Sequence, residues 1–140
     1  ESTASTERVQ LVAYITGHGW GAEVENCAEF CNHTHHFSVN GTEFVKEHLR
    51  AGQSQGCVDQ IEDGVVPNQY GTWPYGRAGW CPGLDVKPWV VDVTDAMVSG
   101  ENIITYVGLF NGETYVPTPS GSGQGFGANI TMSSYLVTWE

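Results

Sequence analysis

Short runs of β-branched and aromatic residues recur along this chain, and few stretches show helical periodicity. Residues 8–16 (RVQLVAYIT) have the composition of a buried strand, which we expect to end at residues 17–19. Residues 33–39 alternate between two faces and are followed by Asn40-Gly41, the strongest short-range hairpin signal. We therefore predict a hairpin whose returning strand covers residues 42–45.

The second half of the chain continues this pattern. Residues 88–94 (PWVVDVT) and 101–110 (ENIITYVGLF) are predicted strands, joined by a short turn or single helical turn at 95–100. Residues 129–139 (NITMSSYLVTW) form the closing strand. This succession predicts an all-β fold, an antiparallel two-sheet jelly-roll sandwich with its long loops at one end.

Two interruptions are long for a compact domain. Residues 46–82 contain Gly, Gln, Asp, Asn and Pro with little periodicity. Loops of that length are usually functional or cross-linked, and a Cys57–Cys81 bridge would be such a cross-link. Residues 117–128 (PTPSGSGQGFGA) are a low-complexity loop.

Length and composition fit one domain of this class. The chain has 140 residues, of which 40% are hydrophobic, enough for a sizeable core. We expect a flexible leader or linker over residues 1–7 and a single domain over 8–140. The net charge of −11 argues against nucleic acid as a partner, because such binding needs a basic footprint.

The four cysteines contain no C-x-x-C pair, and four cysteines allow three pairings. Scarce lysine and frequent Trp, Tyr, Gly and Asn are typical of a secreted protein, extracellular or periplasmic, in which disulfides persist. No apolar run is long enough to span a membrane. No signal peptide is visible, so we expect a mature or excised form.

Two segments carry most of the candidate chemistry: Cys27-Ala28-Glu29-Phe30-Cys31 and Arg77-Ala78-Gly79-Trp80-Cys81-Pro82-Gly83. A glutamate inside a tight disulfide loop would be pre-oriented to position water or hold a sugar hydroxyl, although Glu29 can also be an exposed loop acid. Arg77 can donate a fork of hydrogen bonds to substrate oxygens, or brace loop carbonyls. Trp80 offers a flat face to a sugar ring and an N–H free to donate, or packs beside a disulfide.

These segments resemble the second domain of the peptide-N-glycosidase F family, whose enzymes cut the amide between asparagine and an N-linked glycan. Further matching segments are residues 15–19 (ITGHG), the Asn40-Gly41 turn and the strand over 88–93. The resemblance extends over roughly residues 8–139. It implies a jelly roll, and its architecture is also similar to that of the copper domains of peptidylglycine monooxygenases.

The resemblance also implies roles for individual residues. Glu29 matches an active-site glutamate, and Arg77 and Trp80 match substrate-contacting positions. The implied disulfides are Cys27–Cys31 and Cys57–Cys81. The principal catalytic aspartate of the family lies in a preceding domain, and this chain is long enough for only one. We therefore expect glycan-related function with little or no amidase activity from this chain alone.

The histidines suggest another chemistry. His33 and His35 share one strand face with Phe37 and Val39, and histidines two apart on a strand can chelate copper or zinc. The alternative is that they bond loop carbonyls and no cofactor is used. His18 and His48 are the further histidines that could approach from elsewhere in the chain, and the sequence indicates no definite third ligand.

Loop aromatics supply a further candidate surface. Trp73 and Tyr75, like Trp80, fall in the glycine- and proline-broken loop, where aromatics bind sugars or form a small core.

Three Asn-x-Ser/Thr triplets are glycosylation candidates, at Asn32, Asn40 and Asn129. The partners considered are an N-glycan or glycopeptide, an adjacent domain and copies of the chain itself. The alternatives to an amidase half are a glycan-binding or self-assembling extracellular module and a copper- or zinc-binding jelly roll.

Overall fold

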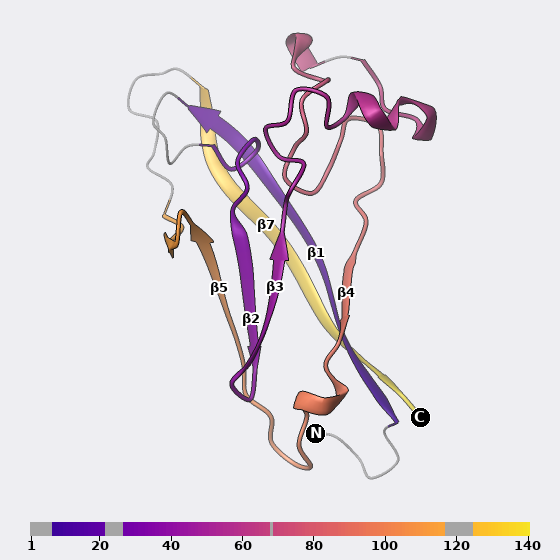
Figure 1. Cartoon of the computed structure of the whole chain (residues 1–140), viewed down its shortest axis with the longest axis vertical. Helices are drawn as coiled ribbons and strands as arrows, with labels where there is room; N and C mark the ends of the chain where they lie inside the picture. The colour runs from indigo at the N-terminus through magenta and orange to yellow at the C-terminus, as the bar shows by residue number, and fades with distance from the viewer. Residues whose placement is uncertain (1–6, 22–26, 68, 117–124) are drawn as a thin grey trace.

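Two antiparallel β-sheets, stacked as a sandwich, form the body of the molecule (Figure 1). The computed structural model describes residues 7–21, 27–67, 69–116 and 125–140. One sheet has the strand order β4-β1-β7 and the other β3-β2-β5-β6. The strands are β1 (Arg8–Gly21), β2 (Thr34–Val39), β3 (Thr42–Glu47), β4 (Trp89–Asp92), β5 (Ile104–Phe110), β6 (Glu113–Thr114) and β7 (Gly125–Trp139). The predicted two-sheet fold is confirmed.

The core lies between β1 and β2. Every second residue at the start of β1 is almost completely buried, as expected for a strand with one face on the core. Across from it, Phe37 and Val39 of β2 fill the interior, and Val93 closes one end. The buried residues of this core are Val9, Leu11, Ala13, Ile15, Phe37, Val39 and Val93.

The β2–β3 hairpin has the turn that its sequence predicts. Asn40 and Gly41 have φ angles of 50° and 89°, the left-handed pair of a type I′ turn, with Val39 opposite Thr42. The Asn40 side chain also accepts the N–H of Ile103 at 2.9 Å. This turn fixes the register of the whole ladder, in which His35 pairs with Lys46.

Three strands are longer than expected, and of these β3 continues two residues further, to Glu47. β1 runs on to Gly21 because β7 pairs with it over its whole length, with a register shift between His18 and Trp20. β7 begins at Gly125, inside the stretch predicted as a low-complexity loop. The rest of that loop, residues 117–124, and residues 1–6 of the expected leader lie outside the described part of the chain.

The long connection between β3 and β4 gathers at one end of the sandwich (Figure 1). It contains two 3₁₀ segments, η1 (Val58–Asp63), which is kinked at Gln60, and η2 (Gln69–Gly71), and the Cys57–Cys81 disulfide. A third, η3 (Thr94–Ala96), lies in the turn predicted between β4 and β5. Cys57, Val65 and Cys81 form a second small core under this loop. None of the helices in the described residues is long and apolar enough to cross a membrane.

Candidate functional site

The Cys27–Cys31 disulfide closes a tight loop that carries Glu29 at its centre. The N–H groups of Phe30 and Cys31 both donate to the Cys27 carbonyl, at 2.7 and 2.8 Å. The backbone of Glu29 is held on both sides, because its N–H donates to Gly19 and its carbonyl accepts from Ala78. The carboxylate is thereby anchored between β1 and the 77–81 segment.

Glu29 and Arg77 form an ion pair across this junction. Arg77 Nε donates to Glu29 Oε1 at 2.7 Å, and the backbone N–H of Gly19 lies 3.3 Å from Oε2. The Arg77 side chain has no exposed surface, whereas 14% of the Glu29 side chain is exposed. The carboxylate is thus fixed in orientation, with an edge that solvent or a ligand can reach.

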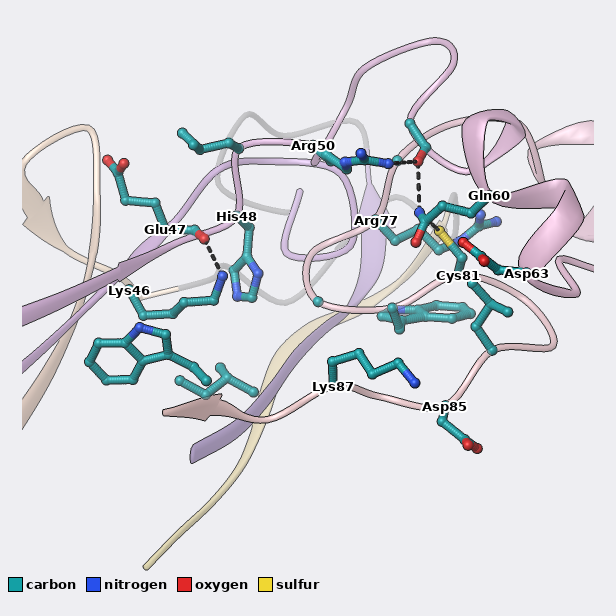
Figure 2. A pocket seen from close by; sticks show the side chains of 18 of the residues that line it. Lys46, Glu47, His48, Arg50, Gln60, Asp63, Arg77, Cys81, Asp85 and Lys87 are labelled. Carbon is teal, nitrogen blue, oxygen red and sulfur yellow. Dashed lines mark hydrogen bonds between the residues drawn. The ribbon is translucent and has the colours of Figure 1, made fainter. Parts of the chain in front are cut away.

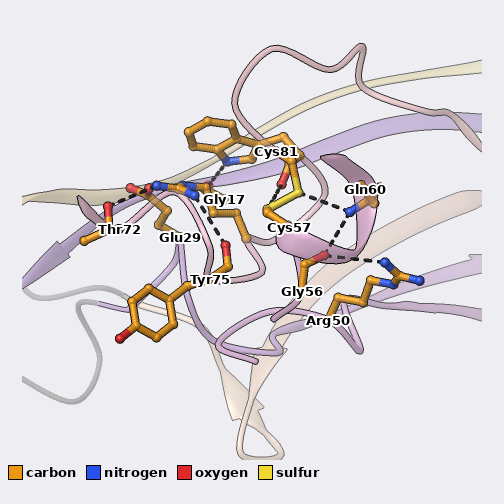
Figure 3. Close-up of a disulfide and its surroundings, with 11 residues drawn as sticks. Gly17, Glu29, Arg50, Gly56, Cys57, Gln60, Thr72, Tyr75 and Cys81 are labelled. Atoms are coloured by element: carbon orange, nitrogen blue, oxygen red, sulfur yellow. Dashed lines mark hydrogen bonds and ion pairs between the residues drawn. A yellow bond between two sulfur atoms is a disulfide. The ribbon is translucent and has the colours of Figure 1, made fainter. Parts of the chain in front are cut away.

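The other guanidinium nitrogens of Arg77 also have protein partners, Thr72 and Tyr75, which are both labelled in Figure 3. NH2 donates to the Thr72 hydroxyl at 3.1 Å, and NH1 donates to the Tyr75 carbonyl at 3.3 Å. The group lies over the rings of Phe30 and Trp80, 5.2 and 4.8 Å from their centroids. Arg77 therefore joins the glutamate loop to the long 48–88 connection.

Trp80 is tied into the same junction. Its indole N–H donates to the Gly17 carbonyl at 2.9 Å, so the expectation that this N–H is free to donate was wrong. A side chain at residue 17 would collide with the Ala28 carbonyl, so the glycine lets the Glu29 loop lie against β1 here. The ring of His18 lies 5.3 Å from the Trp80 ring, tilted by 32°.

Of the other loop aromatics, one packs in a small core and two are exposed to solvent. Trp73 packs against the small core around the Cys57–Cys81 disulfide. Tyr75 contacts Phe30 edge-on and is 43% exposed, and Tyr70 is fully exposed. The cluster thus has one side in a core and one side in solvent.

A cavity of about 680 Å³ opens beside this junction (Figure 2). Four of the chain's five basic residues line it: Lys46, Arg50, Arg77 and Lys87. Glu47, Asp63 and Asp85 also line it. These cations face three carboxylates, and Arg77 is already paired with Glu29, so the lining is mixed in charge and suits a polar ligand.

Three histidines meet deep in the sandwich, next to the glutamate loop. His33, His35 and His48 are buried, with 0%, 0% and 4% exposure. His33 Nδ1 lies 2.9 Å from His35 Nε2, and that atom lies 3.1 Å from His48 Nε2. His33 and His35 share the buried face with Phe37 and Val39, as predicted. His48 is the third member that the sequence left undefined.

Burial lowers the pKa of all three imidazoles. It lowers the pKa of His35 and of His48 to about 3, assisted by the charges of the neighbouring histidines and of Lys46. Burial also lowers the pKa of His33, against a backbone hydrogen bond to Ala28 that raises it. At neutral pH the three rings are uncharged and have lone pairs.

The three glycosylation candidates have different surroundings. Both N–H groups of the Asn40 side chain are used, at 2.9 Å to the Ala96 carbonyl and 2.7 Å to Asn102 Oδ1. A glycan on Asn40 would replace one of these donors. Asn32 Oδ1 accepts the backbone N–H of His48, and the Asn129 amide lies 3.3 Å from the Gly127 carbonyl.

The protein is a β-sandwich domain braced by two disulfides, in which a loop carboxylate is paired with a buried arginine. Sequence comparison identifies its family. Residues 1–137 match the family model for peptide-N-glycosidase F, C terminal. The chain belongs to this family. The peptide-N(4)-(N-acetyl-beta-D-glucosaminyl)asparagine amidase F of Elizabethkingia miricola is 28% identical over 137 residues, which cover 95% of this chain and 35% of that protein. This chain therefore spans about a third of its curated relative.

Solved structures agree on the fold. PNGase F, a glycosylasparaginase from Flavobacterium meningosepticum, superposes with a TM-score of 0.66 at 22% identity, covering 97% of this chain and 40% of that one. A recombinant PNGase F gives a TM-score of 0.67 at 24% identity, covering 99% and 41%. The predicted membership in this family is confirmed, and so are both predicted disulfides.

Proposed function

We propose that this domain forms one side of a composite N-glycan amidase site, with Glu29 as its chemical group. The observation that carries the proposal is the Glu29–Arg77 pair: a carboxylate held in one orientation by a buried arginine, with an edge still exposed. A carboxylate held in this way can accept a hydrogen bond from water, a sugar hydroxyl or the substrate amide without first being ordered. Preorganisation of this kind is what a reacting centre requires.

The amidase chemistry needs a second group from elsewhere. Hydrolysis of an amide requires activation of water and stabilisation of the leaving nitrogen, and one carboxylate cannot provide both at once. The resemblance assigns the principal aspartate to a preceding domain, and this chain spans 35% of its amidase relative. We infer that the domain alone has little or no amidase activity.

The remaining assigned residues act around Glu29. Arg77 is completely buried, so we assign it a positioning role exerted through the carboxylate, in place of direct substrate contact. The exposed ring of Tyr75 and the half-buried ring of Trp80 are the sugar-contacting surfaces in this proposal, and Trp73 supports them from the small core. The natural ligand is then an N-glycan or glycopeptide.

The two disulfides support an extracellular or periplasmic location, because such bonds persist in oxidising compartments. They close the two loops that meet at the Glu29–Arg77 pair. A reducing compartment would loosen both sides of the proposed site.

Ligand binding and product formation test the proposal separately. A glycopeptide with asparagine-linked chitobiose is titrated into the isolated chain and followed by NMR or calorimetry. We expect weak binding that Glu29→Gln reduces several-fold. The control Glu113→Gln, an exposed carboxylate on β6, leaves it unchanged.

The same glycopeptide is then analysed by mass spectrometry for conversion of asparagine to aspartate. We expect no product with the isolated chain. Aspartate that appears with the wild type and disappears with Glu29→Gln would refute the need for a second domain. Equal binding by wild type and Glu29→Gln would remove Glu29 from the site.

A second candidate function, an assembly module, rests on an open edge of the sandwich. Among the described strands β7 is an edge strand, and Leu136, opposite the buried Leu11, is 41% exposed. Between β7 and β5 a groove of about 490 Å³ is lined by Ile104, Leu136 and neighbouring residues. Apolar residues that lie on the core face of an edge strand but remain exposed are typical of a surface that another β-domain or another copy of the chain covers.

Light scattering after size exclusion, over a wide concentration range, tests this second candidate. Self-assembly predicts concentration-dependent oligomers that Leu136→Lys dissolves. Leu49→Lys, at an exposed residue that does not line this groove, serves as control. A monomer at all concentrations would rule out self-assembly.

A further inference from the structure

The hairpin geometry brings three histidine side chains to one point. His33 immediately precedes β2 and His35 is its second residue, and both side chains are buried. Lys46 pairs with His35 and Glu47 with Thr34, so the residue after β3, His48, comes opposite His33. Directly opposite residues of an antiparallel pair lie on the same face, which places all three imidazoles together.

The ring nitrogens converge at metal-ligand spacing. His33 Nδ1 and His35 Nε2 are 2.9 Å apart, His35 Nε2 and His48 Nε2 are 3.1 Å apart, and one nitrogen from each ring lies within 4.8 Å of the others. Imidazole nitrogens at about 2.0–2.1 Å from one metal ion lie about 3.3 Å apart in a tetrahedral site. Small ring movements would bring the three atoms to that spacing.

Counting protons leaves two arrangements: either His35 Nε2–H donates to His33 Nδ1 while the Tyr106 O–H donates to His35 Nδ1, or the proton lies on His35 Nδ1 and the two facing nitrogens both have lone pairs, which is the state that binds a metal ion. His33 Nε2 lies 2.9 Å from the Ala28 carbonyl, which can only accept, so that nitrogen carries the proton and Nδ1 of the neutral ring has a lone pair. His35 Nε2 has two nitrogen neighbours and at most one proton. If the proton sits on His35 Nδ1, which faces the Tyr106 hydroxyl at 2.8 Å, the His33 and His35 lone pairs point at each other.

Hydrogen bonds from neighbouring groups hold the three histidines in place, as hydrogen bonds to metal-binding histidines do in known metal sites. The bond to Ala28 fixes His33, the Tyr106 hydroxyl fixes His35, and Asn32 Oδ1 accepts the His48 backbone N–H at 2.7 Å. Glycines leave room for the rings. A Cβ at residue 17 would lie 2.6 Å from His33 Nε2, and one at residue 79 would lie 3.0 Å from His48 Cε1.

We propose that His33, His35 and His48 bind a late first-row transition metal ion, zinc or copper, through His33 Nδ1 and the Nε2 atoms of His35 and His48. Three imidazoles without a carboxylate suit these ions and not magnesium or calcium. All four cysteines are in disulfides and do not compete as ligands. His48 also lines the 680 Å³ cavity, which provides an approach for the ion and for an additional ligand.

The proposal links the metal to the glutamate loop without depending on amidase function. The bond from His33 Nε2 ends on the Ala28 carbonyl, one residue before Glu29. A metal that fixes His33 therefore also fixes the backbone that carries the carboxylate. This predicts that the ion stabilises the loop, whichever chemistry the loop performs.

The test uses the untagged chain after treatment with a chelator. Zn²⁺ and Cu²⁺ are titrated separately by calorimetry, and bound metal is counted by elemental mass spectrometry. We expect one equivalent of at least one ion, with first-shell nitrogens from three imidazoles in its X-ray absorption spectrum. His33→Ala, His35→Ala and His48→Ala should each weaken binding at least about tenfold.

His36 provides the matched control, because it lies on the same strand with its ring on the other face. His36→Ala should bind the metal as the wild type does. Since removing a buried histidine can disturb folding, His48→Gln, at the least buried of the three, is compared by circular dichroism, and metal should raise the Tm of the wild type but not of this variant. Absence of binding, or binding that survives all three ligand variants, would overturn the proposal.

Discussion

The guanidinium of Arg77 and the carboxylate of Glu29 meet at 2.7 Å across 48 residues of sequence. One partner is completely buried and the other is 14% exposed. Each is anchored by a different disulfide-closed loop, so the pair is where the two loops are joined.

Removing one partner of this pair should be strongly destabilising. Arg77→Met leaves the Glu29 carboxylate without its cation and deletes two further hydrogen bonds, so we expect a loss of about 3 kcal/mol in the free energy of unfolding. Urea titration measures it. Arg8→Met, which breaks the half-exposed pair with Asp92, should change little.

The double variant Arg77→Met/Glu29→Gln separates the stability contributed by the Glu29–Arg77 interaction from that contributed by the other contacts of Arg77. If the pair acts as a unit, its loss of stability will be smaller than the sum of the two single losses by about 1–3 kcal/mol. Additive losses would show that Arg77 stabilises the loops through its other contacts.

The two disulfides should contribute unequally. Closing a loop constrains the unfolded chain more when the loop is longer, and the separations are 24 residues for Cys57–Cys81 and 4 for Cys27–Cys31. Replacing Cys57 and Cys81 by serine should cost about 3 kcal/mol, and replacing Cys27 and Cys31 about 2 kcal/mol. Thermal unfolding of the two double variants gives the order. The reverse order would mean that local packing, and not chain entropy, determines their effect.

The histidine cluster should make the metal-free protein sensitive to acid. The pKa values of His35 and His48 are about 3 in the folded chain, against 6.5 for an exposed histidine. Between these values the unfolded chain binds more protons, so the free energy of unfolding must fall as pH falls from about 6.5 towards 3. The slope is at most about 1.4 kcal/mol per pH unit for each histidine.

Urea titrations of the chelator-treated protein between pH 7 and pH 4 measure this slope. His48→Gln removes one titrating group and should flatten the curve. An unchanged slope in that variant would mean that other groups, such as the acidic residues, control acid stability.

Much of the fold follows from local signals in the sequence. Asn40-Gly41 has φ angles that few other residue pairs adopt, so both the hairpin and its register were predictable. The alternation around Phe37 identified the buried face correctly. The end of β1 was not predictable locally, because its extension to Gly21 depends on pairing with β7, more than a hundred residues away.

The candidate site was only partly predictable for the same reason. Motif resemblance identified Glu29, Arg77 and Trp80, but not that Arg77 is fully enclosed or that the Trp80 N–H is bound by Gly17. His48 could have been found, since the two-residue turn places it opposite His33. The Thr72 and Tyr106 hydroxyls could not, because loop folding and a cross-strand contact bring them to the site.

Gly17 joins the carboxylate loop and the histidine cluster, and its substitution tests that connection. Its N–H donates to the Ala78 carbonyl at 2.9 Å, and its carbonyl accepts from Trp80. A Cβ there would collide with the Ala28 carbonyl and lie 2.6 Å from His33 Nε2. The Ala28 carbonyl and the buried His33 ring are hydrogen-bonded to each other, so neither can move away from the new Cβ without disturbing the other.

We therefore expect Gly17→Ala to lower the free energy of unfolding by about 1–3 kcal/mol, the usual cost of overpacking, and to shift the NMR signals of both Glu29 and His33. Gly127→Ala is the matched control, since a Cβ at that β7 position meets no atom within 4 Å. It should be neutral or slightly stabilising. If Gly17→Ala shifts the signals of one residue and not the other, the carboxylate loop and the histidine cluster are separate units, and a metal at the histidines would then have no structural route to Glu29.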